Sequence, residues 1–112
     1  MRNLNLKSGF PTVDEARRRL LREMQVAGKN KVRLIKIIHG WGSTGEGGRI
    51  ATAIRRSLSL RVKEGKALAF VPGERFSSDT LEGRELVARH PSVLADRDFN
   101  RANPGITILE LA

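Results

Sequence analysis

The sequence changes character abruptly at His39, and this change constrains the fold more than any other feature. Residues 32–38 include apolar side chains at both odd- and even-numbered positions, a pattern typical of a strand that is buried on both faces. Five of the nine residues that follow His39 are glycine, and beyond them Ile50, Ala53 and Ile54 recur at helical spacing. The pattern predicts a buried strand, then a glycine-rich turn, then a helix.

A glycine-rich turn between a strand and a helix is well suited to binding an anion. Glycine lets the backbone approach a ligand closely and adopt positive φ. The N–H groups and the dipole at the start of the following helix favour a negatively charged group, most often a phosphate. We therefore predict a phosphate-binding site at this turn. Its candidate residues are Gly40, Trp41, Gly42, Ser43, Thr44, Gly45, Gly47, Gly48, Arg49, Lys7 and Arg55.

The charge of the chain indicates what kind of anion this is. The 112 residues, which we take as one domain, include 21 Lys plus Arg against 12 Asp plus Glu, a net charge of +9. This excess favours polyanions such as RNA, DNA or a ribosome surface over a general solubility role. We expect Lys36, Arg56 and Arg75 to extend the basic track if they share the face of the turn.

Composition also excludes several classes of protein. There are no cysteines, which excludes disulfides and thiolate metal sites. No apolar run approaches the roughly 20 residues that span a membrane, and Met1-Arg2-Asn3-Leu4 lacks the apolar core of a signal peptide. We expect a cytoplasmic location and no membrane partner, and the oligomeric state stays open.

The remaining pattern completes the fold. In chain order it predicts a strand at 4–7, a helix from 13 to 28, the strand 32–38, a helix from 48 to 60, and strands at 67–71 and 106–111. Thr12 and Glu15 form a capping box for the first helix. The order β-α-β-α-β-β predicts an α/β (α+β) two-layer sandwich, with a mixed four-stranded sheet and two helices on one face.

Residues from about 73 to 104 form an insertion before the last strand. This segment is too long for a simple loop in a small domain. We expect it to be partly helical, with a helix over 80–90 and a helical turn over 92–95. Whether it covers the sheet or closes over the glycine turn is open.

The charged side chains of the insertion are expected to be structural rather than metal-binding. Asp96 and Asp98 are expected to be solvated turn acids or partners of Arg97 and Arg101. His90 is expected to be a helix-terminal or surface residue.

His39-Gly40-Trp41-Gly42, between a strand and a glycine-led helix, resembles the H-G-x-G motif of the Smr (small MutS-related) domain family. The resemblance extends to Val13-Asp14-Glu15-Ala16 at the start of the first helix and to residues 105–111 in the closing strand. Leu4-Asn5-Leu6-Lys7 stands where this family usually has Leu-Asp-x-His. The resemblance covers nearly the whole chain except for residues 73–102.

The resemblance implies a fold similar to the C-terminal domain of translation initiation factor three, and it implies nucleic-acid binding. In several members it also implies endonuclease activity on DNA or RNA, including events at stalled ribosomes. Asn5 and Lys7 replace the family's aspartate and histidine, which are implicated in cleavage in active members. We therefore favour recognition of the phosphate backbone of RNA, of a ribosome-linked structure or of structured DNA.

Two alternatives stay open. The first is an endonuclease in which His39 is the acid–base residue and Lys7 stabilises developing negative charge. Asn5 does not ionise, so it is neither a base nor a strong metal ligand. We expect no cofactor, with Mg²⁺ needed only if the protein is a nuclease. The second alternative is a protein-interaction module whose insertion docks a partner.

Trp41 has two interpretations that the sequence leaves equal. Its indole can stack on an unpaired base, or it can fold over the end of the core as a lid.

Two other phosphate motifs fit less well. Residues 40–45 satisfy the dinucleotide pattern G-x-G-x-x-G, but the strand 67–71 provides no acidic residue for a ribose. A P-loop needs Gly-Lys-Ser/Thr, and Gly45-Glu46 breaks that pattern.

Overall fold

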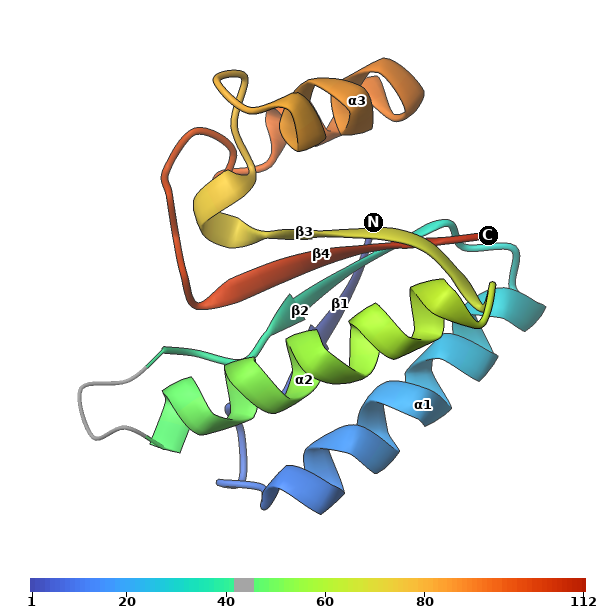
Figure 1. Ribbon diagram of the computed structural model, residues 1–112, viewed down its shortest axis with the longest axis vertical. Coiled ribbons are helices and arrows are strands. Elements are labelled where there is room, and N and C mark those ends of the chain that lie inside the picture. The colour runs from blue at the N-terminus through green and yellow to red at the C-terminus, as the bar shows by residue number, and fades with distance from the viewer. Residues whose placement is uncertain (42–45) are drawn as a thin grey trace.

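The computed structural model describes residues 1–41 and 46–112 of the chain. Its elements, in order, are β1 (Arg2–Asn5), α1 (Val13–Lys29), β2 (Leu34–Ile38), α2 (Glu46–Lys63), β3 (Ala67–Pro72), the short 3₁₀ helix η1 (Gly73–Arg75), α3 (Leu81–Arg89), the 3₁₀ helix η2 (Pro91–Ala95) and β4 (Ile106–Leu111). The four strands form one sheet in the order β1-β2-β4-β3 (Figure 1).

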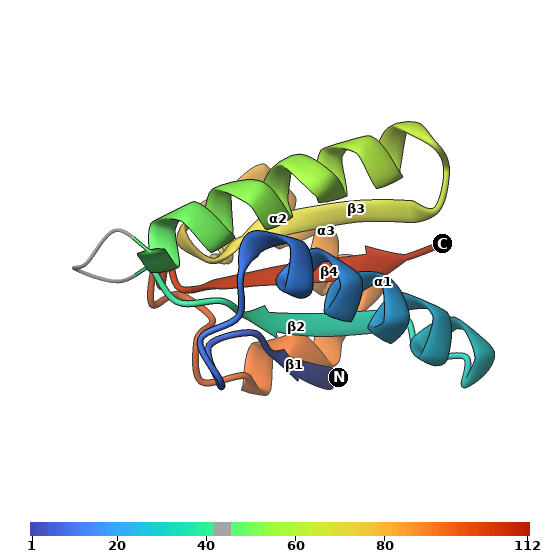
Figure 2. The same cartoon turned by 90° about the horizontal axis from the view of Figure 1, so that it is seen from below.

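The sheet is mixed, as predicted. β1 runs parallel to β2, and β4 lies antiparallel between β2 and β3. Helices α1 and α2 both cover one face of this sheet (Figure 2). The arrangement follows from right-handed crossovers on a common sheet, and it confirms the predicted fold class.

The core between these helices and the sheet is aliphatic. Its buried side chains come from both strand and helix positions that the apolar spacing had indicated. They include Leu4, Leu20, Ile35, Ile37, Ile54, Leu58 and Leu109.

The insertion covers the opposite face of the sheet and adds a third layer (Figure 1). A second core lies there, made up of Leu34, Val71, Phe76, Leu86, Val93, Phe99, Ile106 and Ile108. The Phe76 and Phe99 rings meet edge to face, with their centroids 5.1 Å apart. The insertion therefore buries the second face of the sheet. This is why β2 has apolar side chains on both of its faces.

The predicted Thr12 cap of α1 is present, and α3 has a similar cap that was not predicted. The Thr12 hydroxyl oxygen accepts from Glu15 N at the start of α1, and the Thr80 hydroxyl oxygen accepts from Gly83 N at the start of α3. Within the described part of the chain, no helix has the length and apolar content needed to cross a membrane.

Most element boundaries differ from prediction by one to three residues; β2, for example, begins at Leu34 rather than at residue 32. Two of the differences have local reasons. β1 ends at Asn5, not at Lys7, because the Asn5 side-chain oxygen accepts from the backbone N–H groups of Lys7 and Ser8 and turns the chain. α2 runs from Glu46 to Lys63, longer than the predicted 48–60, and the chain leaves the helix at Gly65 with φ +75°.

Gly73 provides a test of how closely the start of the insertion packs against its end. A Cβ at this position would lie 1.8 Å from the Asn103 carbonyl oxygen and 2.6 Å from Ile106 Cγ1. We predict that Gly73→Ala lowers the free energy of unfolding by at least about 1–3 kcal/mol, because the backbone must shift. Urea denaturation measures this.

The matched control is Gly28→Ala in α1, where an added Cβ meets nothing within 4 Å. Alanine favours a helix over glycine, so this variant should be as stable as the wild type or more stable by about 0.5–1 kcal/mol. Equal stability of the two variants would contradict the prediction.

Candidate nucleic-acid interface

The candidate site lies at the edge of the sheet where the parallel strands β1 and β2 both end. Lys7 follows β1, and its side chain lies against Gly40, which follows β2: a Cβ on Gly40 would be 3.2–3.3 Å from three Lys7 side-chain carbons. Gly40 has φ +72°, which favours glycine at this position. The Gly105 carbonyl accepts from the backbone N–H groups of His39 and Gly40, so the end of the insertion meets the same edge.

His39 is buried at this edge, with 2% of its surface exposed. Its Nδ1 lies 2.9 Å from the Gly40 carbonyl oxygen, and its Nε2 lies 2.9 Å from the Thr107 hydroxyl oxygen. A carbonyl only accepts, so Nδ1 carries a proton and donates it. Burial lowers the pKa of His39, and the Arg55 charge lowers it further, against the raising effect of the Gly40 carbonyl. The neutral ring then accepts from the Thr107 hydroxyl at Nε2.

This geometry bears on the alternative in which His39 is the acid–base residue of an endonuclease. Both ring nitrogens are engaged inside the protein, and the ring does not face solvent. His39 holds the end of β2 to β4 and fixes the carbonyl of Gly40. In this structure it is a positioning residue for the turn.

Arg55, on α2, continues the same chain of hydrogen bonds. Its Nε donates to the Thr107 hydroxyl oxygen at 3.1 Å, and its terminal nitrogens donate to the Glu74 carboxylate at 2.8 and 3.2 Å. Its guanidinium carbon lies 5.5 Å from the centroid of the Trp41 ring. The same guanidinium also reaches two backbone carbonyls, those of Pro104 and Ile106.

The structure therefore gives Arg55 a different position from the one the sequence predicted. It was a candidate phosphate contact, but its donors are used by Glu74, Thr107 and the backbone. Arg55 instead contacts the Trp41 ring and supports it at the surface.

Trp41 is 45% exposed. The ring is not part of either core, so it is not a lid buried over the end of the sheet. It borders a surface pocket of about 250 Å³ that is also lined by Lys7, Arg97 and Gly105. We call these four residues and Gly40 the strand-end rim.

A buried ion cluster lies behind the strand-end rim and holds the segment that carries Arg97. Lys36 points from β2 toward the insertion and is 6% exposed. Its Nζ lies 2.8 Å from Asp96 Oδ1 and pairs with Asp98 as well. Asn103 also donates to Asp98. Burial opposes ionisation, but the hydrogen bonds from Lys36 and Asn103 hold the pKa of Asp98 below its ordinary value.

Two expectations are wrong here. Lys36 does not extend the exposed basic track, because it is buried and neutralised. Asp96 and Asp98 are not solvated turn acids, because their main partner is Lys36. Arg97 has a side chain that is 90% exposed; it lies 4.0 Å from Asp98, as expected of a partner of that acid, and it also lines the rim. Lys36 lies within a strand that has apolar side chains on both faces. A charged side chain in such a strand indicates a buried partner of opposite charge.

The other predicted residues lie nearby or outside the described chain. Arg49 is exposed near the start of α2 and lines a neighbouring pocket. Gly47 and Gly48 lie in the first turn of α2, where a Cβ on Gly48 would be 3.4 Å from the Trp41 carbonyl oxygen. The other predicted residues of the turn, Gly42, Ser43, Thr44 and Gly45, lie outside the described residues.

His90 lies at the end of α3, as expected, but it has a buried partner. Its Nε2 is 2.8 Å from the Glu110 carboxylate, which Arg89 also holds with two hydrogen bonds. Glu110 is 2% exposed on β4. This cluster fastens α3 to the sheet away from the rim.

The chemistry that the rim offers is cationic and aromatic. Lys7 and Arg97 provide positive charge, and Trp41 provides an exposed π face. Among residues 1–41 and 46–112, no three His, Asp or Glu side chains gather as a metal-binding group would require. The arrangement is suited to holding a phosphate beside a stacked base.

Comparison with known proteins agrees with this fold. The model of the Smr domain matches residues 6–76, more than half of the chain. The chain belongs to the Smr domain family. Members of this family generally bind nucleic acids. The matched region stops at Phe76, so α3 and β4 lie beyond it.

One solved structure extends the likeness to the whole chain. The crystal structure of the Smr domain of Thermus thermophilus MutS2 superposes with a TM-score of 0.63, covering 100% of this chain and 99% of that one. The two sequences are 17% identical, so this likeness concerns the fold alone. No curated protein sequence matches the chain.

The buried ion cluster predicts a large effect of Lys36→Met. The substitution leaves Asp96 and Asp98 without their cation, and breaking a buried pair in this way costs about 3–5 kcal/mol. We expect that loss in the free energy of unfolding, measured with urea. Lys66→Met, at an exposed lysine, is the control and should change stability by less than about 0.5 kcal/mol. Equal stability of the two variants would contradict the cluster's role.

His39 predicts a pH dependence. The folded protein keeps this ring neutral, whereas the unfolded chain binds a proton at the ordinary pKa of about 6.5. The contribution of His39 to stability should therefore be complete above about pH 6.5 and decrease as the pH falls below it. NMR titration of a His90→Gln variant, which leaves one histidine, reports the pKa directly. A His39 pKa at or above the ordinary value would refute this.

Proposed function

We propose that this Smr domain binds nucleic acid through the strand-end rim, using cations for the phosphate backbone and Trp41 for an unpaired base. The observation that carries the proposal is the support of the Trp41 ring. Arg55 holds the indole from within, 5.5 Å away, while the ring stays 45% exposed beside Lys7 and Arg97. A large aromatic side chain fixed at the surface among cations suits a stacked base.

The charge of the chain supports the same ligand. The net charge is +9, and the acids nearest the rim, Asp96 and Asp98, are both paired with Lys36. Lys36 offsets part of this negative charge, and Lys7 and Arg97 are the exposed cations that face a ligand here. Binding through such contacts weakens steeply as salt rises.

The target we favour is an unpaired stretch of RNA, including RNA in a ribosome-linked structure, with structured DNA second. Phosphate contacts do not distinguish these polymers, whereas the indole needs a base that is out of the duplex stack. We place this activity in the cytoplasm.

Binding accounts for the described residues better than hydrolysis does. His39 is buried with both nitrogens engaged, and the Asn5 side-chain oxygen is occupied by the backbone of the β1–α1 turn. Recognition of this kind requires no cofactor.

Trp41→Ala is the first test. We predict that this variant binds a fluorescein-labelled 12-nucleotide single-stranded RNA more weakly by about 1–3 kcal/mol, because one stacking contact is lost. Fluorescence anisotropy at several salt concentrations measures the affinity. Arg97→Ala should reduce the slope of log K against log salt by about 1, because one phosphate contact is lost.

Leu68→Ala, at an exposed leucine on edge strand β3, is the control and should bind as the wild type does. If Trp41→Ala and Leu68→Ala bind equally well, the rim is not the interface. The same labelled RNA and DNA, run on a denaturing gel after incubation with and without Mg²⁺, should stay intact. Cleavage that disappears in a folded His39→Gln variant would instead establish the endonuclease.

A further inference from the structure

Phe10 stands out because the fold makes no use of it. Its surface is 92% exposed, the highest value among the large apolar side chains. Its backbone has φ +47°, a left-handed conformation that costs a non-glycine residue energy. Glycine at this position would remove both the exposed apolar surface and the strain. Neither core contains the ring, so packing does not explain why the residue is phenylalanine.

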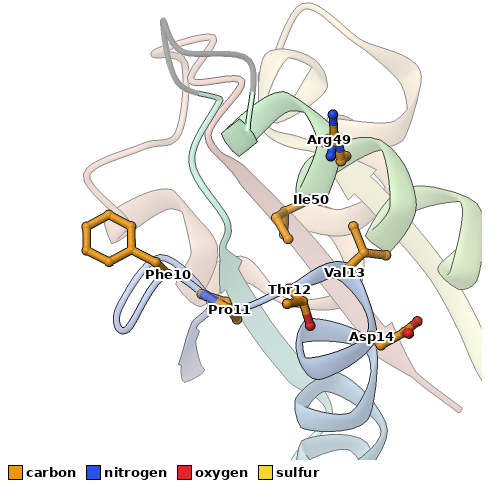
Figure 3. Close-up of a pocket in the computed structure, with 7 residues that line it drawn as sticks. All are labelled: Phe10, Pro11, Thr12, Val13, Asp14, Arg49 and Ile50. Carbon is orange, nitrogen blue, oxygen red and sulfur yellow. The ribbon is translucent and has the colours of Figure 1, made fainter.

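The surroundings of Phe10 form a pocket between the start of α1 and the first turns of α2. Its volume is about 430 Å³, and Figure 3 shows the Phe10 ring projecting from the β1–α1 segment at one side of it. Val13 and Ile50 provide an apolar floor, since both side chains point between the two helices. Arg49 lies on the α2 side and is exposed.

We propose that Phe10 and Arg49 form a second nucleotide subsite, with an unpaired base stacked on the Phe10 ring and its phosphate held by Arg49. This inference rests on the proposed function and extends the same interface from one stacked base to two. The occupant is a single-stranded stretch of nucleic acid. Its aromatic bases match the ring face, and its charge matches Arg49.

The subsite is placed to continue the strand-end rim. Phe10 follows Lys7 by three residues on the β1–α1 segment, and Arg49 lies in the helix that begins after Trp41. The β1–α1 segment and the segment after β2 leave the same end of the sheet (Figures 1 and 2). In this proposal, a strand that stacks on Trp41 continues past Lys7 toward Phe10.

A base fits this pocket better than a hydrophobic protein segment does. Apart from Phe10, the exposed rim of the pocket is polar, with Thr12, Asp14 and Arg49 at its edge. Asp14 lies 3.8 Å from Arg17, which offsets its charge, and its carboxylate can accept from the amino groups that bases carry.

The test is Phe10→Gly with the labelled 12-nucleotide RNA. We expect binding that is about five- to tenfold weaker, the lower part of the range for one lost stacking contact. The melting temperature should be unchanged or higher, because the exposed ring and the backbone strain are both removed. Leu94→Ala, another exposed apolar residue, is the matched control and should bind as the wild type does.

Two further measurements separate stacking from an indirect effect. An RNA of the same length with abasic sites keeps its phosphates, so wild type and Phe10→Gly should bind it equally. The double variant Phe10→Trp/Trp41→Phe carries its only indole at position 10, and RNA should quench its fluorescence.

If Phe10→Gly bound the single-stranded RNA as tightly as the wild type does, the proposed subsite would be wrong. Phe10 would then serve another partner, such as a protein. The proposed function would survive that result if Trp41→Ala still weakened binding. If neither the wild type nor any variant bound RNA or DNA, the proposed function and this subsite would both be wrong.

Discussion

A buried chain of hydrogen bonds organises the functional end of this domain. It runs from Arg55 through the Thr107 hydroxyl to the His39 ring and ends on the Gly40 carbonyl. Through it α2, β4 and the end of β2 are held in one arrangement, and the neutral state of His39 lets its Nε2 accept from the Thr107 hydroxyl. The part of the H-G-x-G motif that can be seen here is therefore a support for the turn, with its binding groups placed around it.

A second set of interactions brings the insertion to the same place. Lys36 pairs with Asp96 and Asp98 across the sheet's second face, and Gly73 allows the start of the insertion to pack against its end. These contacts bury the second core and leave Arg97 exposed beside Lys7 and Trp41. The insertion thus contributes Arg97 to the proposed interface, although most of it lies outside the region that the family model matches.

The residues of this end divide by burial into two groups. His39, Thr107 and Lys36 are buried and satisfied by protein partners, so they position other groups. Lys7, Trp41, Arg97, Arg49 and Phe10 are exposed and are the ones available to a ligand. All five are cationic or aromatic, a combination suited to holding single-stranded nucleic acid through its phosphates and bases.

The elements that local signals define were predicted well. Apolar spacing and Thr12 placed α1, the length of the insertion indicated the helix that became α3, and the strand 106–111 was predicted with its observed bounds. The end of β1 was predicted two residues late, because the side-chain hydrogen bonds of Asn5 compete with strand pairing there.

The sequence by itself determined the order of elements, the mixed α/β architecture and the place where strand ends and glycines meet, because hydrophobic period, caps and turn residues act over a few positions. Only the tertiary structure decided that His39 is buried, that Arg55 supports Trp41 and that Asp98 serves Lys36. Each of these depends on partners from separate elements of the fold, His39 and Thr107 being 68 residues apart and Lys36 and Asp96 being 60 apart. Such pairs form where packing excludes water, and no local pattern records which side chains will meet there.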